Sequence, residues 1–483
     1  MTDFWQLLVC FVCLLMPAAI AAKESPNPTG LEPRNQPNIL FLFTDDQSFE
    51  TIGSLGLTDI ETPAIDRLVR RGTLLTHAYN MGSWSPAVCV ASRTMLITGR
   101  SIWDAQRIHH ATDQEREAGL LWPQLMKQAG YETFMTGKWH IQTDAARVFD
   151  LVRDVRGGMP RDVAAGYNRP RIDVPDRWSP SDPQFGGFWE GGRHWTEVAA
   201  DHACDYLNQR DSEAPFFMYV AFNAPHDPRQ APQEFVERYP LSRVEVPRNF
   251  LPLYPFRDEI GCSADLRDEK LGPFPRTEHA VRVHRQEYYA AITHLDSQIG
   301  RILDALDASG KADNTWIFLT ADHGLAVGHH GLFGKQNLYD HSVRVPLVVV
   351  GPGVAASRRV STPVYLQDVM ATSLELANAH RPDHVFFRSL LPLLHNPSSP
   401  RPYSEIYGAY LRLQRSITVD QMKLIAYPKA DTLRLYDLAN DPLEMNDLAA
   451  VPARRAQRDE LFQRLIELQK SLGDQLDLTS LAD

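Results

Sequence analysis

The stretch Ile39-Leu40-Phe41-Leu42-Phe43-Thr44-Asp45-Asp46 joins an apolar run to a pair of acidic residues. The run has the length of a β-strand and is apolar at every position rather than at alternate ones. Such a strand belongs in a sheet that is covered on both faces. The two carboxylates would lie at the carboxyl end of the strand, where open α/β sheets place their ligands. Alone, an acidic pair is also typical of a turn or a helix cap.

Three more apolar runs have strand length and are bounded by breakers: residues 216–220, 316–319 and 345–350. Residues 278–308 carry apolar side chains near a 3.6-residue period, which predicts a long packing helix. These elements predict an α/β fold with a central sheet between helices. Apart from the run at 216–220, residues 150–275 are rich in Pro, Gly, Trp and Arg, and they predict long loops on the substrate side.

The character of the sequence changes near residue 396. Strand-like segments at residues 414–418 and 422–427 precede a predicted closing helix at residues 452–472. Its first residue, Pro452, is acceptable in the first turn of a helix, where the missing N–H leaves no bond unmade. We expect a catalytic domain over residues 37–395 and a small C-terminal subdomain over residues 396–483.

The N-terminus has the features of a secretory signal. Residues 7–16 form an apolar core, and Ala19-Ile20-Ala21 supplies small residues for cleavage. This predicts a signal peptide at residues 1–22, a Pro-containing linker at residues 23–36, and a secreted or periplasmic protein with no stable membrane span after signal removal. Because no Lys or Arg precedes the core, an N-terminal membrane anchor is the alternative, although the run is short for a span.

The chain of 483 residues has 49 Lys and Arg against 60 Asp and Glu, a formal charge of −11. This acidity argues against nucleic acid as a partner but leaves room for an anionic substrate in a local basic pocket. Two of the five cysteines, Cys10 and Cys13, lie in the predicted signal. Cys204 and Cys262 could form one disulfide in an oxidising compartment, or remain separate thiols.

A further carboxylate is predicted at a second strand end. Asp322 follows the apolar run at residues 316–319 within the stretch Asp322-His323-Gly324. Together with Asp45 and Asp46 it would form a set of three carboxylates, and hard cations such as Ca²⁺ or Mg²⁺ prefer oxygen ligands of this kind.

The stretch Cys89-Val90-Ala91-Ser92-Arg93 is followed at fixed spacing by Thr98-Gly99-Arg100. Alone, a Cys four positions before an Arg is an ordinary buried Cys. The longer pattern resembles C-x-P-S-R-x4-T-G-R, the signature of the type I sulfatases of the alkaline-phosphatase-like superfamily, with Ala91 where the family usually has Pro. Other segments resemble family motifs in the family's order: Gly137-Lys138-Trp139-His140, Ala224-Pro225-His226-Asp227-Pro228, the segment from Gly328 to Lys335, and the segment from Leu435 to Glu444.

The resemblance implies a large mixed central sheet flanked by helices on both faces, with a smaller C-terminal α+β subdomain. It also implies a metal site. The expected ligands are Asp45, Asp46, Cys89, Asp322 and His323. Ca²⁺ is the expected ion, with Mg²⁺ as an alternative, and the imidazole of His323 leaves Mn²⁺ or Zn²⁺ open.

By the same resemblance, a formylglycine-generating maturation enzyme would oxidise Cys89 to formylglycine (3-oxoalanine), whose hydrate attacks sulfur. His140 would take a proton from the remaining hydroxyl as sulfate leaves. Lys138, Lys335 and Arg93 would supply positive charge, with the two lysines binding the sulfate group. His226 would bind sulfate and act as general acid at the ester oxygen, whereas His330 is expected to support the site.

The expected substrate is a sulfated carbohydrate, such as a sulfated polysaccharide or glycosaminoglycan fragment. Five basic and aromatic residues outside the motifs are candidates for sugar contacts: His109, His110, Arg193, His194 and Trp195. One alternative is a phosphomonoesterase or phosphodiesterase of the same superfamily. Another is a non-catalytic protein that binds sulfated glycans, which would follow if Ala91 prevented the maturation of Cys89.

Overall fold

The computed structural model describes residues 36–161 and 163–481, and the chain from Pro37 onward forms one compact unit. The predicted signal peptide and all but the last residue of the predicted linker lie outside the described residues. Within the described part of the chain, no helix is long and apolar enough to cross a membrane.

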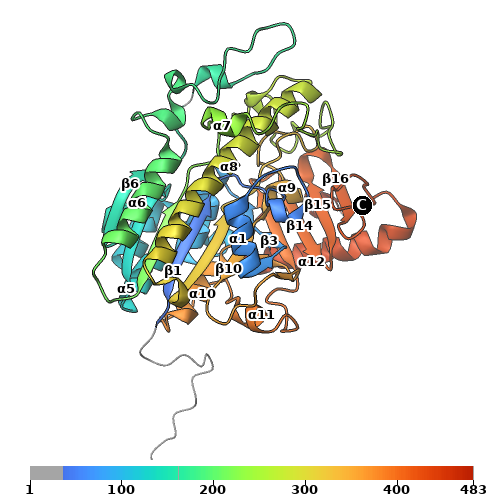
Figure 1. Cartoon of the computed structure of the whole chain (residues 1–483). Coiled ribbons are helices and arrows are strands. Elements are labelled where there is room, and N and C mark those ends of the chain that lie inside the picture. The colour runs from blue at the N-terminus through green and yellow to red at the C-terminus, as the bar shows by residue number, and fades with distance from the viewer. Residues whose placement is uncertain (1–35, 162, 482–483) are drawn as a thin grey trace, which may run out of the picture. The chain divides into compact units, whose positions relative to one another are not determined.

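The core of the fold is an eight-stranded sheet with the strand order β11-β2-β10-β8-β1-β7-β5-β6 (Figure 1). The strands that position the site are β1 (Asn38–Thr44), β5 (Glu132–Lys138), β7 (Phe216–Ala221) and β8 (Thr315–Ala321). These four strands are parallel, whereas β10 runs antiparallel to β8. The expectation of a mixed sheet is confirmed. The remaining strands are β2 (Thr73–Leu75), β6 (Leu151–Arg156), β10 (Leu347–Val350) and β11 (Arg358–Val360).

Both faces of this sheet are covered, as the continuous apolar run of β1 predicts. Its side chains alternate between two cores, with Phe41 and Phe43 in one and Leu40 and Leu42 in the other. The helices on the Phe41 side are α2 (Val88–Thr98), α5 (Trp122–Gln128) and α10 (Asp368–Leu376). Those on the Leu40 side are α1 (Pro63–Arg71), α6 (Trp195–Gln209) and α8 (Glu278–Ala308). The long helix predicted at residues 278–308 is confirmed as α8.

Two sequence predictions need correction. The strand predicted at residues 345–350 is divided at Pro346 into β9 (Arg344–Val345) and β10, because Pro has no N–H for a sheet ladder. The region 150–275 is not only loops, since it contains β6 and α6 as well as β7. Helix α6 packs against α8, and its buried face includes three alanines, which give little hydrophobic periodicity.

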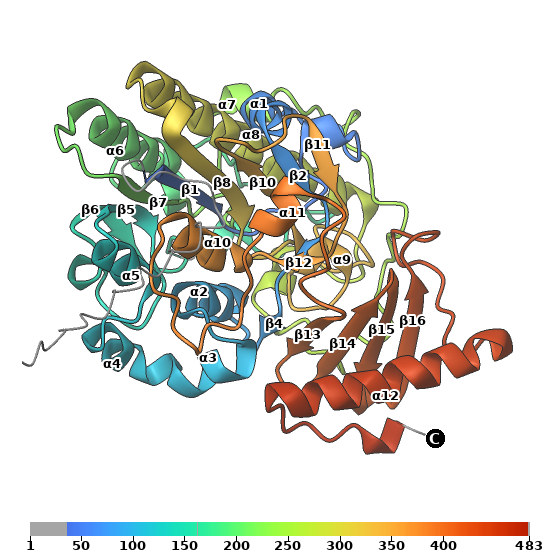
Figure 2. The ribbon, with the colours of Figure 1, turned by 90° about the horizontal axis from the view of Figure 1, so that it is seen from below.

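The C-terminal part is a smaller α+β unit, as expected. Its antiparallel strands are β13 (Ile406–Tyr410), β14 (Gln414–Val419), β15 (Met422–Tyr427) and β16 (Thr432–Asp437), and α12 (Arg455–Leu472) contacts β14 and β15. A fifth strand, β4 (Gly82–Ser83), comes from the N-terminal half and pairs in parallel with β13 (Figure 2). A Cβ on Gly82 would lie 1.9 Å from the Ala409 carbonyl oxygen, so the pairing requires glycine.

The question of a disulfide is also resolved. Cys204 and Cys262 are both free, so the reading as two separate thiols is correct. Cys262 is buried and lies 3.3 Å from the Gln336 carbonyl oxygen, whereas Cys204 is half-buried on α6.

Candidate active site

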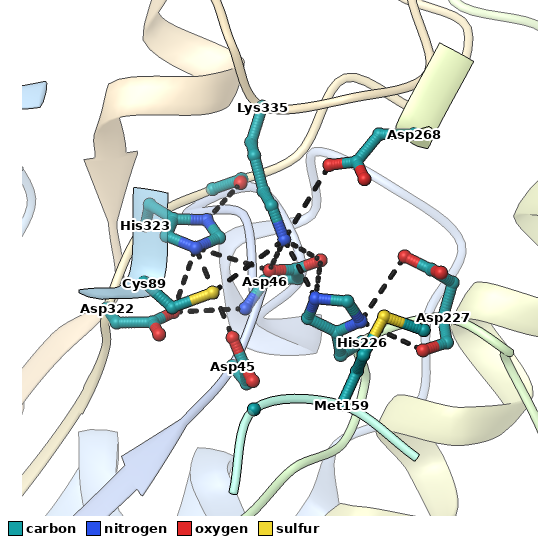
Figure 3. A network of polar contacts seen from close by, with 12 residues as sticks. Asp45, Asp46, Cys89, Met159, His226, Asp227, Asp268, Asp322, His323 and Lys335 are labelled. Atoms are coloured by element: carbon teal, nitrogen blue, oxygen red, sulfur yellow. Dashed lines mark hydrogen bonds and ion pairs between the residues drawn. The ribbon is translucent and has the colours of Figure 1, made fainter. Parts of the chain in front are cut away.

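The carboxyl ends of β1, β8, β7 and β5 meet at one edge of the sheet, and the residues singled out in the sequence follow them (Figure 3). Asp45 and Asp46 follow β1, and Asp322 and His323 follow β8. All four side chains are fully buried. Strands β1 and β8 pair in register up to Thr44 and Ala321, which brings the two acidic segments side by side.

Cys89 is the second residue of α2 and is 3 % exposed. It therefore lies at the positive end of the helix dipole, close to the carboxylates. Burial raises the pKa of its thiol, but Lys138 and Lys335 outweigh this effect and hold the pKa well below its usual range. The position thus favours negative charge on the side chain.

Arg93 lies one helical turn beyond Cys89 and is fully buried. Its Nε donates to Asp322 Oδ2 at 3.0 Å, and its guanidinium donates to the Lys138 carbonyl oxygen at 3.2 Å. The guanidinium also lies 4.6 Å from the centre of the Phe43 ring. Arg93 does not line the cavity that Cys89 and Lys138 line, so it holds the segments of the site together rather than facing a ligand.

Two lysines connect the acidic segments to the nucleophile position. Lys335 Nζ donates to Asp46 at 2.8 and 3.0 Å, lies 3.0 Å from His226 Nε2, and lies 3.9 Å from Cys89 Sγ. Lys138 donates to Asp45 Oδ2. Both ammonium groups therefore lie where they can neutralise an anion next to Cys89.

The two histidines of the site differ in their environments. His140 is half-buried and lines the same cavity as Cys89, and burial lowers its pKa. Gly158 lies directly against its ring, since a Cβ there would be 2.8 Å from His140 Cε1. His226 is buried, and its Nδ1 lies 2.8 Å from the Asp227 carbonyl oxygen. Burial lowers its pKa, but Asp46 outweighs this effect and the net shift is upward.

Four side chains of the expected metal set offer ligand atoms within 4.8 Å of one another: Asp45, Asp46, Cys89 and His323. Asp45 Oδ1 and His323 Nε2 are buried without a hydrogen-bond partner in the described residues. Buried polar atoms are rarely left unpaired, so these two atoms fit a bound cation. Asp322 lies at the edge of this group, because its Oδ1 accepts from the Asp46 N–H at 3.2 Å and lies 3.4 Å from His323 Nε2.

A cavity of about 300 Å³ opens above this group. Cys89, Lys138, His140, His226 and Lys335 all line it, as do Pro86, Ala87, Gly158, Met159, Leu266, Arg267, Asp268 and Gln336. Arg267 binds Asp227 at 2.6 Å and also contacts Asp268.

The sequence did not point to Arg267 or Asp268, because they lie at the start of a short 3-10 helix (Asp268–Leu271) in a region without periodicity or motif. Asp227 also lies at the site, but only its neighbour His226 was singled out. His330, which was expected to support the site, contacts His341 and the Glu444 carbonyl oxygen and lies outside the cavity.

None of the five candidates for sugar contacts lines this cavity. His194 is fully buried and caps the N-terminus of α6, Arg193 pairs with Asp201, and Trp195 lies under the Arg156 guanidinium. The His109 and His110 rings are tilted against each other with their centres 4.8 Å apart, and the His109 ring centre is 5.8 Å from that of Trp84.

Comparison with known proteins agrees with the fold and the site. A sequence model described as Sulfatase matches residues 37–379, and one described as N-sulphoglucosamine sulphohydrolase, C-terminal, matches residues 328–471. An N-acetylglucosamine-6-O-sulfatase of Bacteroides thetaiotaomicron is 25% identical, over 95% of this chain and 91% of its own.

Solved structures share the fold. One, a complex with its substrate D-glucosamine-2-N,6-O-disulfate, has a TM-score of 0.70 at 23% identity and covers 91% of this chain and 98% of its own. A phosphonate monoester hydrolase of Agrobacterium radiobacter has a TM-score of 0.69 at 20% identity, covering 90% of this chain and 96% of its own. The family match spans most of the chain. The protein therefore belongs to the sulfatase family of the alkaline-phosphatase-like superfamily, and it is a sulfatase.

Proposed function

We propose that the protein removes sulfate from a sulfated carbohydrate, using a formylglycine made from Cys89 and a divalent metal ion. The observation that carries this proposal is the position of Cys89, which lies at the N-terminus of α2 near two lysines and beside ligand atoms of Asp45 and His323 that have no hydrogen bond. The carbohydrate part is supported by the sulfatase relative named for N-acetylglucosamine-6-O-sulfate.

Asp45, Asp46, Cys89, Asp322 and His323 would hold the ion, with Ca²⁺ expected from the oxygen-rich set and another divalent ion possible because of the imidazole. When bound, the ion would neutralise charge on the sulfate group. Oxidation of Cys89 by a formylglycine-generating maturation enzyme would place a hydrated aldehyde at the helix N-terminus, and one of its two hydroxyls would be the nucleophile that attacks sulfur.

The surrounding side chains fit the remaining steps. Lys138 and Lys335 would bind sulfate oxygens next to position 89. Because burial lowers the pKa of His140, its ring is suited to accept a proton from the second hydroxyl at position 89, as sulfate leaves and the aldehyde re-forms. His226, whose pKa is raised, can donate a proton to the ester oxygen as the alcohol leaves. Arg93 would hold Asp322 in position.

The first test is a mass spectrum of the tryptic peptide of residues 72–93 from protein secreted by its native host. A carbonyl at position 89 in place of the thiol is the expected result. An intact thiol would contradict the formylglycine mechanism and would favour a protein that binds sulfated glycans without cleaving them.

The second test compares hydrolysis of N-acetylglucosamine-6-sulfate with that of matched phosphate and phosphonate monoesters. The likeness to a phosphonate monoester hydrolase makes this comparison necessary. We expect the sulfate ester to be cleaved fastest. A higher kcat/KM for either phosphorus ester would instead support the alternative esterase.

A further inference from the structure

A second cleft, of about 970 Å³, lies where the catalytic part meets the C-terminal sheet. It is lined by the residue after β4, by α3 (Ile102–Ile108), by the β13–β14 turn and by the segment after α12. Figure 2 shows α3 close to the C-terminal end of α12. We call this second cleft the α3 cleft. Its main side chains are Trp84, Trp103, Arg107, Arg412, Arg415 and Lys429.

The floor of the α3 cleft is fixed by paired side chains. Arg415 donates to both carboxylate oxygens of Asp474, at 2.6 and 3.0 Å, and its guanidinium lies 4.8 Å from the centre of the Trp103 ring. Trp103 Nε1 donates to the Tyr407 hydroxyl at 3.3 Å. A floor with these contacts is preorganised, which lowers the entropic cost of binding a ligand.

The basic side chains at the rim of the α3 cleft are exposed, unlike the paired side chains of its floor. Arg412 and Lys429 are exposed, and neither forms a hydrogen bond or an ion pair with another described residue. Trp84 is half-buried beside them. The two cations and the indole ring line the same cleft on a chain whose net charge is −11. They complement a sulfated sugar, because the cations can pair with sulfate and the indole can pack against the apolar face of the sugar ring.

The α3 cleft and the catalytic cavity are lined by neighbouring residues of one short segment. Trp84 lines the cleft, whereas Pro86 and Ala87 line the cavity. Three residues span at most about 11 Å, so the two linings approach each other within the length of an oligosaccharide. The segment is held in place by Ser83 Oγ, which accepts from the Ser85 N–H at 3.0 Å and donates to the Ser85 carbonyl oxygen at 2.6 Å.

We propose that the α3 cleft binds a second sulfated sugar unit of the oligosaccharide whose sulfate ester lies in the catalytic cavity. This inference rests on the proposed function, and it makes a sulfated oligosaccharide, rather than a free monosaccharide sulfate, the preferred substrate. Arg412 and Lys429 bind the sulfate of the neighbouring unit, and Trp84 supports its ring.

The test uses tetrasaccharides prepared from heparin, chondroitin sulfate and carrageenan, titrated calorimetrically into the full-length protein. The tetrasaccharide that binds most tightly is then titrated into the variants R412Q/K429Q and W84A. Each exposed charge contact contributes up to about 1 kcal/mol, so the double variant should raise Kd about fivefold to tenfold. Loss of the Trp84 ring should raise Kd about fivefold. Neither variant should change kcat/KM for a monosaccharide sulfate.

The matched control is R401Q/R455Q, which removes two exposed positive charges of the same subdomain outside the cleft. It should change Kd less than twofold. Equal weakening by both double variants, or no binding of any tetrasaccharide to the wild type, would overturn the proposal. Hydrolysis of the monosaccharide sulfate by the wild type tests the proposed function separately. If that hydrolysis is absent, the titrations still decide whether the cleft binds.

Discussion

Two buried clusters of charged side chains differ in how completely their atoms are paired. In the C-terminal cluster, Lys423 Nζ donates to Asp340 at 2.6 Å and to Glu444 at 2.7 Å, and Glu444 also accepts from the Asp340 N–H at 2.7 Å. In the active-site cluster, Asp45 Oδ1 and His323 Nε2 are buried without a hydrogen-bond partner in the described part of the chain, and His323 Nε2 lies 3.3 Å from Asp46 Oδ1 and 3.4 Å from Asp322 Oδ1. Loss of the central cation from the first cluster would leave buried carboxylates unpaired, whereas the second cluster offers ligand atoms that a bound cation can use.

The largest expected loss of activity follows from removing the imidazole of His323, one of the expected metal ligands. The variant H323L keeps a side chain of similar size but cannot bind a cation. We expect kcat/KM to fall at least about a hundredfold to a thousandfold, because charge stabilisation at the sulfate is lost. The bound divalent ion, measured by mass spectrometry of the digested protein, should fall from about one per chain to nearly none. Retention of the ion would show that His323 is not a ligand.

In the C-terminal cluster around Lys423 we expect a loss of stability without a loss of activity. The variant K423M leaves Asp340 and Glu444 without their cation, so the free energy of unfolding should fall by about 3–5 kcal/mol. Activity per folded molecule should stay within about twofold of the wild type. Denaturant unfolding and active-site titration measure the two quantities. A large loss of activity in the remaining folded protein would show that the C-terminal cluster also supports catalysis.

Removal of the metal ion should affect only the active-site cluster. Binding to the folded state alone contributes about 2.7 kcal/mol when the free ion is a hundred times Kd. Excess chelator should therefore lower the Tm of the wild type and of K423M by similar amounts. It should leave the Tm of H323L unchanged. A chelator effect on H323L equal to that on the wild type would place the ion elsewhere.

The smallest expected effect is on kcat and concerns the position of the His140 ring. In G158A the new methyl group would meet His140 Cε1 at 2.8 Å, so the imidazole must shift. Displacement of a catalytic group by a fraction of an ångström should lower kcat about tenfold while KM changes little. The neighbouring variant G157A is the control, since a Cβ there meets no atom within 4 Å. If both variants kept full activity, the placement of His140 would not depend on this contact.

The sequence predicted the parts of the structure that follow from local patterns. The apolar runs ending in Asp45 and Asp322 predicted the central strands and the acidic edge, because strand length, burial and the following residues are all local properties. Resemblance to a family supplied the roles of Cys89 and Lys335. Helix α6 was missed because its buried alanines give little periodicity, and the division at Pro346 was missed because a run of apolar residues concealed it.

Other features could not be predicted, because they arise only when distant segments meet. The loop that carries Arg267 has no pattern of its own, and its place beside Asp227 depends on the packing of the whole substrate side. The cleft around Trp84 likewise combines residues from opposite halves of the chain. The segment ending in Glu444 resembles a family motif, yet the buried carboxylate of Glu444 pairs with Lys423 and does not line the catalytic cavity.

The pairing of β4 with β13 joins a segment made early in synthesis to one made late. Strand β13 leaves the ribosome only after nearly all of the catalytic part has been made, because Gly82 pairs with Ala409. Until then, the segment between β4 and α2 is held by Gln336, whose Nε2 donates to the Pro86 carbonyl oxygen at 3.1 Å, but β4 lacks the strand that pairs with it. A chain that stopped before residue 406 would contain every side chain of the catalytic cavity and would leave β4 without its partner strand.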